Sequence, residues 1–183
     1  EVVALLELAK ELECPNLTLQ PGGPIAGEDN GAVFDRTQAH LAELGPLAKA
    51  RGVTLSVEGH QGSLLEKPGA ALRMMESLWP DVGFTYDPSH WAMQRIPLIE
   101  TEQLLSYTHH VHVRNAKPGA MQALMAEGTV DFEWLVEALR EHAYTGAVAI
   151  EYFNGFDANF EETQALRDRL LALGVDAAPE IES

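Results

Sequence analysis

The chain alternates between short apolar runs and longer segments whose apolar residues recur at helical spacing. Five of the short runs predict β-strands, because they hold alternating or β-branched apolar residues and end near proline, glycine or a charged residue. The run 82–86 stops at Asp87-Pro88, since Pro88 has no amide hydrogen with which to continue a ladder. The expected strands are 16–20, 53–58, 82–86, 109–113 and 147–151.

Apolar residues at helical spacing occupy the segments between these strands. Asp35 is expected to cap the second helix, and Asp131 the helix before the last strand, because an aspartate side chain can accept the free amide hydrogens of a first turn. Pro68 stands at the start of the third helix, where proline is tolerated. The expected helices are 1–13, 35–51, 68–80, 99–107, 131–139 and 159–173, and the end from Gly174 is expected to be frayed.

Strands that alternate with helices predict a parallel sheet covered by helices. Four of the strands end in a residue that can bind a metal: Glu58, Asp87, His112 and Glu151. The intervals between them are 29, 25 and 39 positions (58 to 87, 87 to 112, 112 to 151), which are lengths of strand–helix units. Parallel strands point the same way, so all four ends emerge at one edge. This favours the mouth of a curved barrel over the crevice of an open doubly wound sheet.

The four strand ends predict a site for one divalent metal ion. Three carboxylates and one imidazole suit Mn, Mg or Co and leave Zn or Fe open, whereas a structural zinc prefers thiolates and imidazoles. A single acid at a strand end is as often a helix cap or a solvated loop residue, but four in register on consecutive strands favour the metal site. Further polar residues near these ends are candidates for substrate contact: His60, His90, Arg114 and Lys117.

Composition and charge narrow the range of partners. The chain has 183 residues and a formal net charge of −16, from 28 acidic against 12 basic side chains. A surface this acidic repels nucleic-acid phosphates and anionic membranes, and no apolar run approaches the roughly 20 residues that span a bilayer. The single cysteine, Cys14, cannot form an internal disulfide. We therefore expect a cytoplasmic protein whose partner is a small molecule.

The motifs around the strand ends resemble the xylose isomerase-like barrel superfamily, and most closely its sugar phosphate isomerase/epimerase branch. The similarity covers about 17–173, and the ordered set of motifs is specific although no single motif is. The set comprises Glu58 in Val-Glu-Gly-His, Asp87 and His90 in Asp-Pro-Ser-His-Trp, His112 in His-Val-His, Glu151 in Ala-Ile-Glu-Tyr, and Gly-Thr-Val-Asp-Phe at 128–132.

The resemblance implies a chemistry as well as a fold. It implies that the four strand-end residues hold one divalent ion, that His90 touches the substrate, and that Glu58 and Glu151 act as acid and base from opposite sides of it. The implied reaction is isomerisation or epimerisation of a sugar or related polyhydroxy carbonyl compound, by proton transfer through an enediolate. Two positions depart from the branch, namely Asn115, where many relatives have an acid, and Pro118, where many epimerases have an arginine.

The implied fold is α/β, a (β/α)8 TIM barrel, of which only the last five strands are expected here. Residues 1–183 would then form a single domain, the C-terminal part of a barrel without its first three βα units. The open strand edge at 16–20 would favour self-association, so a homo-oligomer remains open. Three alternative functions also remain open: a metal-dependent dehydratase of inosose type, a hydrolase like the apurinic-site endonucleases, and a non-catalytic sugar-binding or regulatory barrel.

Overall fold

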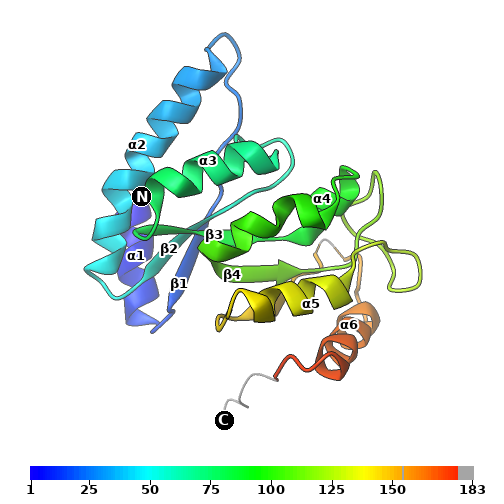
Figure 1. Cartoon of the computed structure of the whole chain (residues 1–183). Helices are drawn as coiled ribbons and strands as arrows, with labels where there is room; N and C mark the ends of the chain where they lie inside the picture. The colour runs from blue at the N-terminus through cyan, green and yellow to red at the C-terminus, as the bar shows by residue number, and fades with distance from the viewer. Residues whose placement is uncertain (154, 177–183) are drawn as a thin grey trace.

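The structure is a computed structural model that describes residues 1–153 and 155–176. Five parallel strands form one sheet in the order of the sequence (Figure 1). This arrangement is a half barrel, and it confirms the predicted partial barrel of five parallel strands. The strands are β1 (Asn16–Leu19), β2 (Thr54–Glu58), β3 (Val82–Tyr86), β4 (Thr108–Val113) and β5 (Val148–Ile150).

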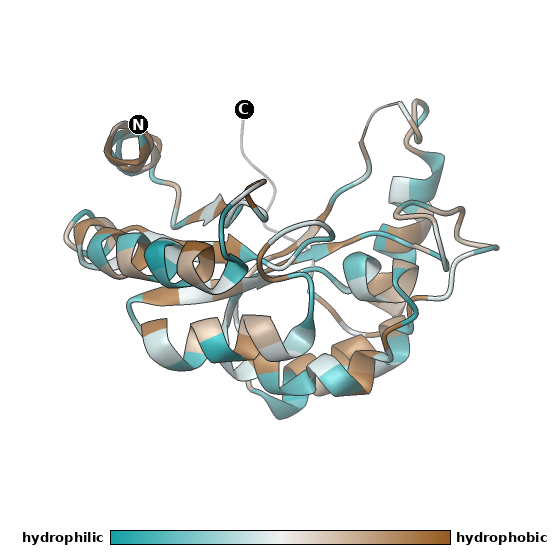
Figure 2. Cartoon of the chain, turned by 90° about the horizontal axis from the view of Figure 1, so that it is seen from above, coloured by the Kyte–Doolittle hydropathy of each residue, from teal (hydrophilic) through white to brown (hydrophobic). Residues whose placement is uncertain are grey.

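Helices connect the strands and cover one side of the sheet, as the view in Figure 2 shows. Among the described residues, no helix is long and apolar enough to cross a membrane. The helices are α1 (Val2–Glu11), α2 (Asn30–Lys49), α3 (Pro68–Leu78), α4 (Pro88–Met93), the 3-10 helix η1 (Leu98–Tyr107), α5 (Phe132–Glu141) and α6 (Glu161–Ala172).

The two faces of the sheet differ in chemistry because successive side chains of a strand point to opposite faces. Leu55 and Val57 of β2 are fully buried in the hydrophobic core, and burial of a side chain of this size stabilises the fold by about 1.5–3 kcal/mol. Ser56, which lies between these two residues, carries a hydroxyl instead, as do Thr18 and Thr85 on the neighbouring strands β1 and β3. The Oγ1 atom of Thr85 lies 2.9 Å from Oγ1 of Thr18 and 2.9 Å from Oγ of Ser56. A polar face therefore leads up to the strand ends.

One edge of the half barrel is apolar and unpaired. Strand β1 pairs only with β2 in the described sheet, so its other edge is open. Helix α1 lies beside this edge and packs against α2, yet it leaves four large apolar side chains 42–64% exposed, namely Val3, Leu5, Leu8 and Leu12. An open strand edge next to an exposed apolar helix face is a surface on which a further polypeptide can pack.

The structure corrects two local predictions. Asp35 does not cap the second helix; α2 begins earlier, because the side chain of Asp29 accepts a hydrogen bond from the amide of Ala32 at 2.9 Å. No helix was expected between 80 and 99, but Pro88 starts the short helix α4, and Asp87 Oδ1 caps this helix by accepting a hydrogen bond from the amide of Ser89 at 2.8 Å. The frayed end expected from Gly174 falls largely in 177–183, outside the described residues.

Candidate metal centre

The structure brings the four strand-end residues together at the carboxyl edge of the sheet. Glu58 ends β2, Asp87 follows β3, His112 lies in β4 and Glu151 follows β5. Each offers one ligand atom, and these four atoms all lie within 4.8 Å of one another. The parallel order explains the convergence, because neighbouring strands of one direction deliver their ends to the same place.

The carboxylates of this cluster differ in exposure. The side chain of Asp87 is 0% exposed and that of Glu58 is 9% exposed, whereas Glu151 is 40% exposed. His112 joins two of them, since its Nδ1 lies 3.0 Å from Oε1 of Glu58 and 3.5 Å from Oε2 of Glu151. Glu151 therefore forms the open side of the cluster.

A buried guanidinium completes the cluster. Arg114 shares the face of His112 by strand alternation, and its side chain is only 1% exposed. Its Nη2 donates to Oδ2 of Asp87 at 2.6 Å, and its Nη1 donates to the backbone oxygen of Glu151 at 3.0 Å and to the Glu151 carboxylate. The sequence predicted a substrate contact for Arg114, but the structure engages this cation with two of the carboxylates. In the sequence, the spacing of two residues between His112 and Arg114 was the signal that both side chains lie on the same face.

The electrostatics of the cluster favour a charged Glu58–His112 pair. Burial alone would raise the pKa of Glu58, but the hydrogen bond to His112 and the nearby charges of His112, His90 and Arg114 lower the pKa below its ordinary value. Burial alone would lower the pKa of His112, but the hydrogen bond to Glu58 and the nearby carboxylates raise it above its ordinary value. Glu58 is therefore ionised at neutral pH, and a metal ion has to compete with a proton for His112.

Two further histidines lie at the rim of the cluster. His90, in the first turn of α4, has its Nε2 3.5 Å from Oδ2 of Asp87, and the amide of Gln61 donates to its Nδ1 at 3.3 Å. Burial lowers the pKa of His90 in spite of the Asp87 charge. The ring of His60 lies 5.8 Å from that of His90, and its Nδ1 is 2.8 Å from the oxygen of Gln61. This contact leaves Nε2 of His60 buried without a hydrogen-bond partner.

Lys117, the remaining sequence-predicted substrate contact, lies in the loop after β4. Its Nζ pairs with Oε2 of Glu127 in the same loop at 2.6 Å, and both side chains are about half exposed. The structure therefore brings His60 and His90 to the cluster's rim and places Arg114 inside it, while it commits Lys117 to a partner within its own loop.

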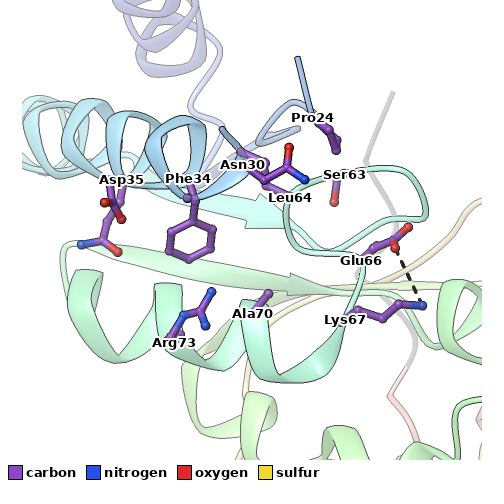
Figure 3. Close-up of a pocket in the computed structure, with 12 residues that line it drawn as sticks. Pro24, Asn30, Phe34, Asp35, Ser63, Leu64, Glu66, Lys67, Ala70 and Arg73 are labelled. Atoms are coloured by element: carbon purple, nitrogen blue, oxygen red, sulfur yellow. Dashed lines mark ion pairs between the residues drawn. The ribbon is translucent and has the colours of Figure 1, made fainter. Parts of the chain in front are cut away.

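A pocket on the helix side of the sheet is separate from this cluster. It measures about 620 Å³ and lies between α2 and α3 (Figure 3). Phe34 and Arg73 face each other across it, with the guanidinium carbon 4.9 Å from the ring centroid. None of the residues lining this pocket belongs to the four-residue cluster.

A sequence profile for the family described as "Xylose isomerase-like TIM barrel" matches residues 1–171, which is most of the chain. Among curated proteins, no sequence matches this chain significantly.

Solved structures share the fold at low sequence identity. A D-tagatose 3-epimerase-like protein has a TM-score of 0.77 at 23% identity, over 94% of this chain and 68% of that one. A xylose isomerase-like TIM barrel protein from Mycobacterium smegmatis, solved in complex with magnesium, has a TM-score of 0.76 at 18% identity, over 93% and 64%. The 3-keto-D-glucoside 4-epimerase of E. coli has a TM-score of 0.72 at 20% identity, over 94% and 68%. This chain thus spans 64–68% of the length of these three structures.

Proposed function

Because this chain belongs to the xylose isomerase-like TIM barrel family, we propose that it acts as a divalent-metal-dependent isomerase or epimerase on a sugar or related polyhydroxy carbonyl compound. The observation that carries the proposal is the convergence of Glu58, Asp87, His112 and Glu151. Of the three solved structures described above, one is a 3-keto-D-glucoside 4-epimerase and another is a D-tagatose 3-epimerase-like protein. Their similar fold supports a carbohydrate substrate by analogy.

The donor set fits one divalent ion. Three carboxylates and one imidazole, all within 4.8 Å of one another, offer the oxygen-rich ligation that suits Mn, Mg or Co, with Zn or Fe also compatible. The similar Mycobacterium smegmatis protein was solved with magnesium. When bound, such an ion would polarise a carbonyl oxygen and the hydroxyl on the next carbon, which acidifies the hydrogen on the carbon that bears this hydroxyl.

Glu58 and Glu151 are the proposed acid/base pair. They come from β2 and the end of β5, the outermost of the four contributing strands, so they approach a bound substrate from different sides. One carboxylate takes the proton from the carbon next to the carbonyl, and the electron pair moves to the carbonyl oxygen to give an enediolate. The other carboxylate delivers a proton to the neighbouring carbon or to the opposite face. The lowered pKa of Glu58 keeps this carboxylate ionised at neutral pH, as a base has to be before it takes a proton.

The remaining predicted residues have proposed roles around this pair. His60 offers a hydrogen-bond acceptor without a protein partner, which suits a substrate hydroxyl. His90 and Arg114 are proposed to bind the substrate oxygens next to Asp87, and Lys117 is proposed to contact the substrate from the loop. We further propose that residues 1–183 form one domain, the C-terminal part of a barrel. An eight-stranded barrel needs three strands in addition to these five.

The proposal is tested by proton exchange with solvent. Ketoses and inosose-like compounds are incubated with the protein in deuterated water with added Mn, Mg or Co, and the products are analysed by mass spectrometry for a changed sugar and for deuterium on carbon. Activity that depends on metal, is abolished by EDTA and is lost in Glu151→Gln supports the proposal. Glu137→Gln, at a carboxylate 65% exposed on α5, is the matched control. Full activity in Glu151→Gln would contradict the acid/base role.

A further inference from the structure

Asn115, the second residue after β4, holds the loop between β4 and α5 together with its side chain. The side chain is buried, with the whole residue only 3% exposed. Its Nδ2 donates to the backbone oxygens of Leu124 at 3.3 Å and Met125 at 3.2 Å. Its Oδ1 accepts hydrogen bonds from the amides of Ala116 at 3.1 Å and Val130 at 3.3 Å. An amide is needed here, because an aspartate of the same shape has no hydrogens to donate to two carbonyl oxygens.

The loop is also packed directly on this side chain. A Cβ atom added to Gly128 would fall 1.9 Å from Cγ and Oδ1 of Asn115, which is far inside any real contact. A glycine is therefore required at 128 for this close approach. Asn115 and Gly128 together define how 116–130 folds back over the start of the loop.

The same loop fastens the two residues that follow Glu151. The backbone amide of Asn115 donates to the hydroxyl of Tyr152 at 3.0 Å. The side chain of Gln122 bonds to both backbone groups of Phe153, with Nε2 donating to the oxygen at 3.2 Å and Oε1 accepting from the amide at 2.8 Å. The chain after β5 is thus held from the loop at two successive residues.

These contacts lead to the reactive carboxylate. The Phe153 ring lies under the guanidinium of Arg114, with 5.0 Å between the guanidinium carbon and the ring centroid. Arg114 in turn donates to the backbone oxygen and the carboxylate of Glu151. Glu151 is 40% exposed, so packing around its own side chain does little to fix it. Its position depends on the chain segment and the cation that the loop holds.

We propose that Asn115 is a positioning residue that fixes Glu151 in the metal centre, acting through the 116–130 loop, Tyr152 and Phe153. The inference rests on the proposed function in so far as Glu151 is a metal ligand. The coupling of the loop to the end of β5 is a separate statement about the chain itself, and it can be measured without metal.

The test compares Asn115→Asp with the wild type by two measurements. The first is Mn²⁺ affinity by titration calorimetry, where we expect binding to weaken roughly tenfold, the size seen when a residue that orients a metal ligand is removed. The second is amide hydrogen exchange in EDTA, where we expect faster exchange in both 116–130 and 148–153 but unchanged exchange in β2 and β3. Asn30→Asp, the same substitution at an exposed residue of α2, is the control and leaves both readouts unchanged.

A Glu151→Gln background separates positioning from general damage. If Asn115 acts through Glu151, Asn115→Asp weakens the residual Mn²⁺ binding no further in this background. An equal loss in both backgrounds, or unchanged exchange in 148–153, would overturn the inference. If the wild type binds no Mn²⁺, the proposed metal function fails, and the exchange measurement still decides whether Asn115 couples the loop to β5.

Gly128 supplies an independent check through the contact with Asn115. Gly128→Ala collides with the amide and is expected to accelerate exchange in 116–130 and 148–153 as Asn115→Asp does. In an Asn115→Ala background the added methyl has room, so Gly128→Ala should change the exchange little beyond the effect of Asn115→Ala. Equal effects of Gly128→Ala in both backgrounds would show that the two residues do not act together.

Discussion

Replacing Arg114 with methionine is expected to destabilise the metal-free protein strongly, although the change leaves the shape of the side chain similar. The substitution removes the hydrogen bond to Asp87, whose side chain is 0% exposed, and the contacts to Glu151. Breaking a buried ion pair costs about 3–5 kcal/mol, because one charge is left buried and unpaired. Asp87 keeps the hydrogen bond from Ser89, so the lower end of that range applies. For a domain of this size, a loss of about 3 kcal/mol lowers the Tm by roughly 6–12 °C.

The assay is thermal unfolding followed by circular dichroism, in EDTA and again with Mn²⁺. Arg167→Met is the matched control, since Arg167 is 59% exposed and pairs with Asp168, which is 74% exposed; such a pair contributes about 1 kcal/mol or less. Mn²⁺ should raise the Tm of Arg114→Met more than that of the wild type, because the ion supplies the missing positive charge. Adding Asp87→Asn to Arg114→Met should recover part of the loss. A Tm change no larger than that of the control would refute the buried ion pair.

Three further outcomes are expected. In Glu151→Gln, hydrogen exchange from substrate carbon into deuterated water should fall at least about a hundredfold, whereas a ketose should still protect the protein against thermal unfolding; retained exchange would remove Glu151 from the proton transfer. The pKa of Glu58 is lowered from 4.5 and that of His112 is raised from 6.5. The ion pair's contribution to stability is therefore fully present between pH 4.5 and pH 6.5. It is lost as pH rises through the folded-state pKa of His112, or as pH falls through the folded-state pKa of Glu58. The Tm difference between metal-free wild type and His112→Gln should therefore shrink from about pH 5.5 to about pH 9, and a constant difference would contradict the charged pair. Leu5→Lys with Leu8→Lys on α1, where the two leucines are 45% and 48% exposed, should lower any self-association measured by light scattering after gel filtration, and an unchanged mass would place the contact elsewhere.

Much of the architecture could be predicted because it depends on local signals. Short apolar runs predict the strands, and residues that end a strand, such as Pro88 after Asp87, predict where they stop. A parallel sheet follows from the alternation of these strands with helices. Once the strands are parallel, the convergence of their carboxyl ends is a matter of geometry. The meeting of Glu58 and Glu151, 93 positions apart (58 to 151), therefore required no knowledge of side-chain packing.

The predictions that were wrong or incomplete depend on contacts that local patterns do not contain. Asp29 and Asp35 are both plausible caps for α2, and only the fold of the preceding loop selects Asp29. The substrate contact predicted for Arg114 stays a prediction, but no local pattern contains its burial, which depends on the carboxylates of Asp87 and Glu151 that β3 and β5 deliver to the same place. At Asn115 the sequence shows only a departure from the acid that many relatives carry. Its role depends on carbonyl groups contributed nine and ten residues later by the loop.

The proposed function depends first on a divalent ion held by the four strand ends. The most direct measurement is bound-metal stoichiometry by mass spectrometry on gel-filtered protein loaded with Mn²⁺, alongside Asp87→Ala and His112→Ala, with folding checked by circular dichroism. We expect about one ion per chain in the wild type and a loss of that ion in both variants. A well-folded wild type that retains no metal, or folded variants that keep the ion, would contradict it.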